Sequence, residues 1–391
     1  MRLSLIILCL MLLGSLSAQS ADTLYVLSAP QFTNPFYKAF SQNYLGVEAA
    51  GRGYTSAALL GTAQNALINP ATMMVDSARV FTEINIKPPV EAEGLIFDSR
   101  YSSPMPFALT GISFSLGKKM AAAICYSNPK SLVLDDFSLI INQGAALVSW
   151  VPKYYLHQIS AISSYDLTPQ IKLGLSIHNQ IHYVDDVIFL HTYDRVQEYN
   201  YALRFQPGVL YHGKALAWGL SAIIPTQMDW DLTYANYDVE LPLELSTGLS
   251  YTIDNYRFAT DFNFSQDSTF DDSFSDRYSF HLGAEQRNGN KILRAGYFFA
   301  SNVWDGQVLL PENTGANADS SIFWQNVSPT LPVKDNAQHF ISAGYGYLFR
   351  DGSLNLSGLG CVAGGTKTVQ INLSLSLYLN AFKREDFLKF R

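Results

Sequence analysis

The 391-residue chain is acidic, with a formal net charge of −7, and only 15% of its residues are charged. About a quarter of the residues are charged in soluble globular proteins, and nucleic-acid binders need a basic surface, so the composition argues against both classes. We therefore expect no nucleic acid among the partners.

Residues 1–21 have the layout of a secretory signal peptide. A short basic start precedes an apolar run from Leu3 to Leu16, and small residues follow it. The run is too short for a comfortable membrane-spanning helix, which needs roughly 20 apolar residues. We expect cleavage between about Ala18 and Ala21, and therefore an exported chain.

Residues 22–78 lack the alternation of the chain that follows. Asn34-Pro35 predicts the start of a short helix, because it places an N-cap residue before a proline in the first helical position. Small residues dominate around Gly51-Arg52-Gly53 and again before Asn69-Pro70-Ala71. Since small side chains allow close backbone packing, we expect residues 46–74 to form a plug in a barrel mouth. The Asn-Pro-Ala motif would lie at the wall.

Alternation with a period of two residues predicts about 14 strands after this segment. It is clearest near the C-terminus, where Leu373 and Leu375 share an aliphatic face and Asn372 and Ser374 share a polar one. Runs of about ten residues suit tilted membrane strands. The strands are expected at 79–88, 106–117, 119–129, 153–166, 169–184, 198–212, 214–225, 242–254, 255–265, 276–288, 291–302, 338–350, 353–363 and 367–379.

Short and long connections alternate between these strands. Short turns are expected at 117–118, 167–169, 212–214, 254–255, 287–290 and 351–352. Long loops are expected at 89–105, 130–152, 185–197, 226–241, 266–275 and 303–337. Periplasmic turns are short and extracellular loops long in outer-membrane barrels, and an even strand number places both termini in the periplasm. The sequence therefore predicts an all-β chain: a closed antiparallel transmembrane barrel over 79–380, an N-terminal hatch with short helices, and a periplasmic tail over 381–391.

The chain resembles the FadL-type family of outer-membrane transporters for hydrophobic molecules. The resemblance rests on Gly51-Arg52-Gly53 and the small residues that lead to Asn69-Pro70-Ala71, followed by the barrel pattern. It extends loosely over the mature chain, including residues 204–209 and 218–221. Related barrels of the PorV type, which serve the type IX secretion pathway, have a similar hatch motif. The resemblance implies an outer-membrane location in a Gram-negative-type bacterium, a hatch formed by these two motifs, and a hydrophobic cargo.

Six polar residues have the parity of the lumen-facing side: Lys172, His178, His182, Arg204, His281 and Arg294. A hydrolase would need a serine and a histidine held by a third polar group, and no motif supports one, so we expect no enzyme. His178 and His182 lie about 13 Å apart along one strand face, too far to share an ion. We therefore expect no metal and no cofactor.

Two proline-containing pairs, Asn128-Pro129 and Pro207-Gly208, fall inside or at the end of predicted strands. Proline removes a ladder donor and glycine loosens the pleat, so both pairs should kink or bulge the wall. Such a gap could release an apolar cargo sideways into lipid, which is the exit that the resemblance implies. The alternative is a bulge with only a structural role.

The leading hypothesis is passive uptake of a hydrophobic small molecule, fatty-acid-like or aromatic, through a hatch-plugged barrel in contact with outer-membrane lipid. The alternative is a non-transporting barrel that docks secretion-system proteins. A cavity between the loops and the hatch would favour transport, and a sealed interior would favour docking.

Overall fold

The computed structural model describes residues 42–74, 77–93, 98–102, 106–135, 137–141, 146–189, 193–232, 235–269, 275–301, 337–364 and 368–380. The predicted signal peptide, the helix expected to start at Asn34, and the tail over 381–391 lie outside these ranges, as does nearly all of the loop expected at 303–337.

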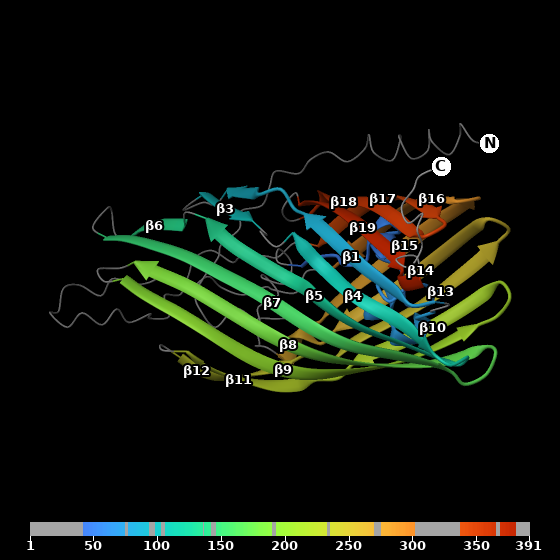
Figure 1. Ribbon diagram of the computed structural model, residues 1–391. Helices are drawn as coiled ribbons and strands as arrows, with labels where there is room; N and C mark the ends of the chain where they lie inside the picture. The colour runs from blue at the N-terminus through green and yellow to red at the C-terminus, as the bar shows by residue number, and fades with distance from the viewer. Residues whose placement is uncertain are drawn as a thin grey trace.

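Within the described part of the chain, fourteen antiparallel strands form a closed barrel (Figure 1). In order around the ring they are β1 (Arg79–Ile86), β4 (Phe107–Leu116), β5 (Met120–Asp135), β7 (Ala146–Asp166), β8 (Ile171–Phe189), β9 (Tyr193–His212), β10 (Leu216–Ile223), β13 (Glu244–Ile253), β14 (Tyr256–Ser265), β15 (Arg277–Asn288), β16 (Lys291–Ala300), β17 (Gln338–Phe349), β18 (Gly352–Ala363) and β19 (Val369–Tyr378). The ring closes where β1 pairs with β19, with Arg79 opposite Tyr378. The predicted fold class is confirmed.

The short connections also lie where the sequence predicts them. Two of these turns contain a glycine with positive φ, Gly117 at 75° and Gly289 at 62°, and a third contains Asp254 at 51°. Glycine adopts this left-handed conformation at little cost, and aspartate tolerates it better than most residues. β1 begins and β19 ends at the rim where these turns lie, so the chain enters and leaves the barrel on the same side.

Four of the predicted long loops are wrong, because they contain strands: 89–105, 130–152, 185–197 and 226–241. β7, β8 and β9 have 21, 19 and 20 residues, about twice the nine to eleven that cross a membrane. Figure 1 shows this part of the wall projecting past its neighbours. Further short strands lie in the remaining connections: β2 (Val90–Glu93), β3 (Asp98–Ser102), β6 (Phe137–Ile141), β11 (Thr226–Leu232) and β12 (Ala235–Leu241). Lipid no longer imposes one apolar face on such extensions, so the alternation that revealed the barrel strands weakens there.

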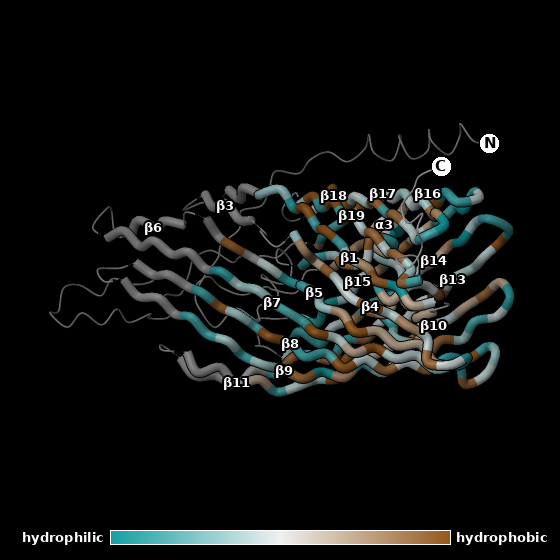
Figure 2. Tube along the Cα trace, in the orientation of Figure 1, coloured by the Kyte–Doolittle hydropathy of each residue, from teal (hydrophilic) through white to brown (hydrophobic). Residues whose placement is uncertain are grey.

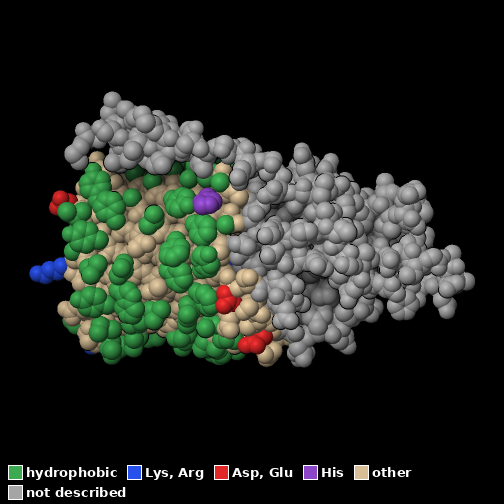
Figure 3. Space-filling view, turned by 180° about the vertical axis from the view of Figure 1, so that it is seen from behind, with side chains coloured by type: hydrophobic (Ala, Val, Ile, Leu, Met, Phe, Trp, Pro, Cys, Tyr) green, Lys and Arg blue, Asp and Glu red, His purple; other side chains and the backbone are tan. Residues whose placement is uncertain are grey.

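The two faces of the wall are oriented as the alternation predicts. On β19, Leu373 is 41% exposed, whereas Asn372 and Ser374 are buried on the inner side. Hydrophobic positions recur along the strands in the half of the barrel nearer the short turns (Figure 2). Hydrophobic side chains cover the described part of the outer face in Figure 3, and charged side chains appear near its borders. This apolar outer band matches the lipid-facing surface of a membrane barrel.

The helices of the described residues are short: α3 (Val47–Gly51) and the 3-10 turns η2 (Asn65–Leu67), η3 (Pro70–Thr72) and η4 (Asp267–Thr269). None of them has the length and apolar character that crossing a membrane requires. Three of the four precede β1, which agrees with an N-terminal segment containing short helices.

Replacing Leu375 with arginine should destabilise the barrel by about 2–4 kcal/mol, because its side chain belongs to the lipid-facing set and lies away from both strand ends. Val369→Arg, at the long-loop end of the same strand, is the control and should cost at most about 1 kcal/mol, since a charge is tolerated near the interface. Urea unfolding in phospholipid vesicles measures both. Equal costs at the two positions would contradict the assigned depth.

Candidate functional site

Residues 42–74, here called the inner segment, cross the barrel lumen before β1 begins. The segment starts where Gln42 bridges to Lys130 on β5 and ends near the short turns, where Ser164 on β7 donates to the carbonyl of Met73 at 2.9 Å. Lys87, just after β1, donates to the carbonyl of Gln42 at 2.7 Å, and burial lowers the pKa of this amine to about 7. The segment is therefore tied to the wall at both of its ends.

Two buried wall carboxylates accept hydrogen bonds from backbone N–H groups of the inner segment. Glu83 on β1 accepts from Gly46 and Val47 at 3.1 and 3.2 Å, at the start of α3. Asp261 on β14 accepts from Ser56 and Ala57 at 2.6 and 2.8 Å. A buried N–H group without an acceptor would cost about as much as a lost hydrogen bond, so both side chains anchor the inner segment.

The Gly51-Arg52-Gly53 motif lies against β15, β16 and β17. Arg52 is 2% exposed and its Nη1 lies 2.7 Å from Glu285, which also accepts from Nε of Arg294 at 2.9 Å. Gly51 and Gly53 fit where a side chain would not. A Cβ on Gly53 would lie 2.4 Å from the carbonyl oxygen of Leu282, and its φ of +67° also favours glycine. The motif therefore combines a buried ion pair with close backbone packing.

The Asn69-Pro70-Ala71 motif lies at the opposite part of the wall. Asn69 caps η3, since its Oδ1 accepts from the N–H of Ala71 at 3.1 Å. Its Nδ2 donates to the carbonyls of Ala57 and Val209, at 2.7 and 3.2 Å. One amide thus joins two turns of the inner segment to β9.

Glycines on neighbouring strands make the wall flat where the inner segment touches it. Directly paired glycines are Gly174 with Gly208, Gly219 with Gly248, and Gly283 with Gly296. A Cβ on Gly174 would lie 2.2 Å from the backbone nitrogen of Ala71, and one on Gly219 would lie 1.8 Å from the carbonyl oxygen of Ala57. These pairs leave the space that the backbone of the inner segment occupies.

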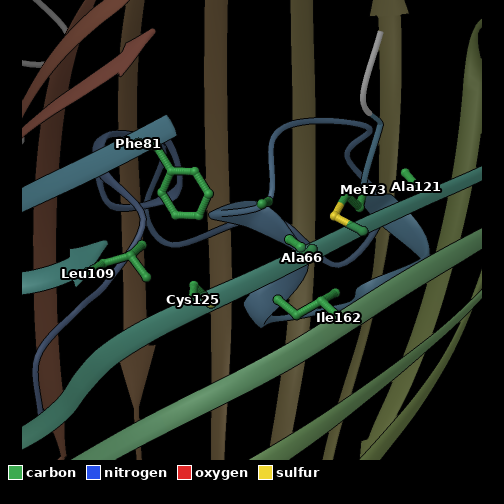
Figure 4. Packing of buried hydrophobic residues seen from close by; sticks show 9 residues of the cluster. Ala66, Met73, Phe81, Leu109, Ala121, Cys125 and Ile162 are labelled. Carbon is green, nitrogen blue, oxygen red and sulfur yellow. The ribbon is translucent and has the colours of Figure 1, made fainter. Parts of the chain in front are cut away.

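Apolar contacts complete this packing. Figure 4 shows Ala66 and Met73 of the inner segment among Phe81, Leu109, Cys125 and Ile162 from the wall. On the other side, Ala50 packs against Phe298 and Phe340, whose rings stack at 4.4 Å. Burial raises the pKa of Tyr44 to about 12 and raises that of Tyr54 further still, so both phenols near this cluster remain neutral.

All six polar residues expected in the lumen are buried on the inner face. Arg294 and His281 hold the inner segment: Arg294 through Glu285, and His281 through a hydrogen bond from Nδ1 to the carbonyl of Gly53 at 2.8 Å. Lys172 pairs with Asp166 beside a short turn, and His182 Nδ1 lies 3.0 Å from the hydroxyl of Tyr154. Arg204 contacts Glu244 at 2.9 Å.

His178 has the surroundings of a catalytic histidine but lacks access to a cavity. Its Nδ1 lies 2.7 Å from Oγ of Ser160 and its Nε2 lies 2.9 Å from Oε1 of Gln206. Ser160 is fully buried, and neither Ser160 nor His178 lines one of the cavities described below. The trio therefore packs the wall. No group of three metal-binding side chains occurs among the described residues.

The two predicted wall irregularities have different outcomes. At Asn128-Pro129 the register of β5 against β7 shifts between Ser127 and Lys130, so a bulge is present. Asn43 of the inner segment fills its inner side, because Nδ2 donates to the carbonyl of Asn128 at 2.9 Å. At Pro207-Gly208 the pairing of β9 with β8 runs through both residues without a shift, whereas the pairing of β9 with β10 ends at Gly208, opposite Ser221. Gly208 makes room for Asn69.

Three cavities flank the inner segment. Two of them, of about 220 and 170 Å³, lie toward the long-loop end and share Tyr54, Leu67 and Glu244 in their linings. The third, of about 370 Å³, lies at the short turns and is lined by Leu60 and Met74 of the inner segment. The inner segment therefore separates spaces at the two ends of the barrel. Sequence reasoning missed Tyr54 and Leu67, because a cavity lining in an irregular segment has no periodic signal.

No protein-family model matches the sequence, and no curated protein sequence matches it. Solved structures do match the fold. A FadL homologue of Pseudomonas aeruginosa superposes with a TM-score of 0.60 at 10% identity, covering 86% of this chain and 99% of that chain. The Pseudomonas putida toluene transporter TodX gives a TM-score of 0.59 at 14% identity, covering 85% and 96%.

The closed barrel, its apolar outer band and the inner segment define an outer-membrane β-barrel protein. Its fold is that of the FadL-type transporters.

Gly219→Ala should lower stability by about 1–3 kcal/mol, because the new methyl group would meet backbone and force the inner segment to move. Gly358→Ala on β18 is the matched control, since its nearest contact would be a carbonyl oxygen 4.0 Å away. Thermal unfolding and protease cleavage within residues 42–74 measure the effect. If Gly219→Ala behaved like Gly358→Ala in both assays, the close packing at this glycine pair would be refuted.

Proposed function

We propose that this chain is an outer-membrane channel for the passive uptake of hydrophobic small molecules, with the inner segment as its hatch. The observation that carries the proposal is the pair of cavities on the long-loop side of the inner segment, with Tyr54 and Leu67 forming part of both linings. A molecule that enters between the loops would meet these cavities before it met the hatch.

The solved structures of the same fold support this function. One is called a FadL homologue, and TodX is called a toluene transporter and a monoaromatic hydrocarbon channel. In our proposal, export begins with cleavage of residues 1–21, residues 22–78 supply the N-terminal extension and hatch, and residues 79–380 form the barrel. The docking alternative, with secretion proteins as partners, is less well supported because the interior on the loop side holds cavities.

We propose the bulge at Asn128-Pro129 as the sideways exit toward lipid. Asn43 closes its inner side through hydrogen bonds to Asn128 and to Oγ of Ser131, at 2.9 and 3.1 Å. Movement of the start of the inner segment would therefore open this part of the wall. The motifs Gly51-Arg52-Gly53 and Asn69-Pro70-Ala71 would hold the rest of the hatch in place.

Uptake in cells tests the function directly. Cells that produce the protein should accumulate a radiolabelled hydrophobic compound faster than cells with an empty vector, and mass spectrometry of the purified protein should identify a bound apolar molecule. Equal uptake together with an empty, lipid-free protein would refute the transport function.

Deleting residues 46–68 should raise the conductance of the barrel for small ions in planar bilayers. A barrel of about 14 strands is too wide for its own side chains to fill, so removing the hatch leaves an aqueous path. The barrel strands are untouched, and the heat-modifiable migration of a folded barrel is the control for correct assembly. An unchanged conductance of the folded deletion variant would contradict the hatch assignment.

A further inference from the structure

Glu244, the first residue of β13, lies at the junction of the two cavities on the loop side. Its side chain is 34% exposed, unlike the carboxylates of Glu83 and Asp261, which are buried against the inner segment. A carboxylate that lines both cavities is accessible to a molecule inside either one.

Arg204 holds this carboxylate in place. Its Nη1 lies 2.9 Å from Oε1 of Glu244, and its Nη2 donates to the carbonyl of Pro242. The arginine side chain lines the smaller of the two cavities, but it is only 4% exposed and so offers little surface to a ligand. Glu244 is thus a prepositioned hydrogen-bond acceptor, because its orientation is fixed before a ligand arrives.

Aromatic rings form another part of the same cavity wall. Tyr44, Tyr54 and Phe298 line the larger cavity, and the ring of Tyr44 lies 5.2 Å from each of the other two. This cavity, the larger of the two on the loop side, has a volume of about 220 Å³. An engineered apolar cavity of about 150 Å³ holds benzene, so this space suits one substituted ring and is small for a long alkyl chain.

We propose that the preferred cargo is a compact ring compound with a neutral hydrogen-bond donor, such as a phenol, and that Glu244 accepts its hydrogen bond. This inference rests on the proposed transport function and names its substrate class. A plain hydrocarbon would bury the carboxylate without replacing its hydrogen bonds to water, which is costly. A carboxylate cargo would be repelled by Glu244, since like charges in a partly buried site interact unfavourably.

Three probes that share a tolyl ring separate these classes: p-cresol carries a neutral donor, toluene carries none, and p-toluate carries an anion. Calorimetric titration into the full-length protein in lipid nanodiscs, with empty nanodiscs as the reference for partition into lipid, gives each dissociation constant. We expect p-cresol to bind at least about tenfold more tightly than toluene, as a hydrogen bond to a charged group implies. We expect p-toluate to bind more weakly than p-cresol.

The variant Glu244→Gln assigns the preference to this side chain. It keeps the size and an acceptor oxygen but removes the charge, so p-cresol should bind more weakly, toluene should bind more tightly, and the preference for p-cresol over toluene should fall about tenfold. Glu240→Gln is the matched control, because Glu240 lies on β12, the strand that precedes β13 in the chain, and lines neither cavity. If Glu244→Gln does not fold, the ratio measured with the unaltered protein still decides the proposal.

The outcomes separate the two proposals. Toluene binding as tightly as p-cresol would overturn the donor requirement and leave hydrophobic uptake intact. Tightest binding of p-toluate would also overturn it and would point to the cations of the linings, which are Arg277 in one cavity and Lys130 and Arg204 in the other. If no tolyl probe binds and cells show no uptake of hydrophobic compounds, the transport function itself fails.

Discussion

The wall of this barrel must supply hydrogen-bond partners to the backbone groups of an irregular segment that crosses its lumen. A buried N–H or C=O without a partner costs as much as a lost hydrogen bond, and the inner segment has few helical turns to satisfy its own groups. Wall side chains supply the partners instead: Glu83 and Asp261 accept from N–H groups, while Ser221 and Ser250 donate to carbonyls at 2.6 and 3.0 Å. The polar lumen is therefore shaped to this one segment.

The same hydrogen bonds require the inner segment to lie close to the wall. Hydrogen bonds of this length form only if the segment can reach the wall, and the glycine pairs at Gly174, Gly219 and Gly283 remove the side chains that would keep it away. Charge then fixes the position, because Arg52 is buried against Glu285 and an unpaired buried Arg52 would be strongly destabilising. Movement of the inner segment must therefore break specific bonds and cannot be a gradual loosening.

The sequence predicts the barrel well because lipid imposes one apolar face on every crossing strand, so Leu373 and Asn372 reveal their faces by alternation alone. It predicts the extended part of β7 poorly, since no lipid acts there. The close packing of the motifs around Arg52 and Asn69 is predictable from their small residues. The role of Gly208 is not predictable, because proline and glycine suggest a kink or bulge, and the sequence does not show that Asn69 approaches this position. The fixed orientation of Glu244 is not predictable either, since it depends on Arg204, a residue 40 positions away.

Under the proposed function, cargo binding can act on the inner segment, because that segment lines the cavities. A ligand shifts a conformational equilibrium only by its differential affinity for the two states. Tyr54 and Leu67 line both cavities and belong to the inner segment, whereas Glu244 belongs to the wall, so a bound molecule touches both parts at once. If it fits Glu244 and the aromatic rings better after Tyr54 has moved, its binding energy opposes the bonds at Arg52 and Asp261. A cargo that contacts the wall alone would bind without opening the path.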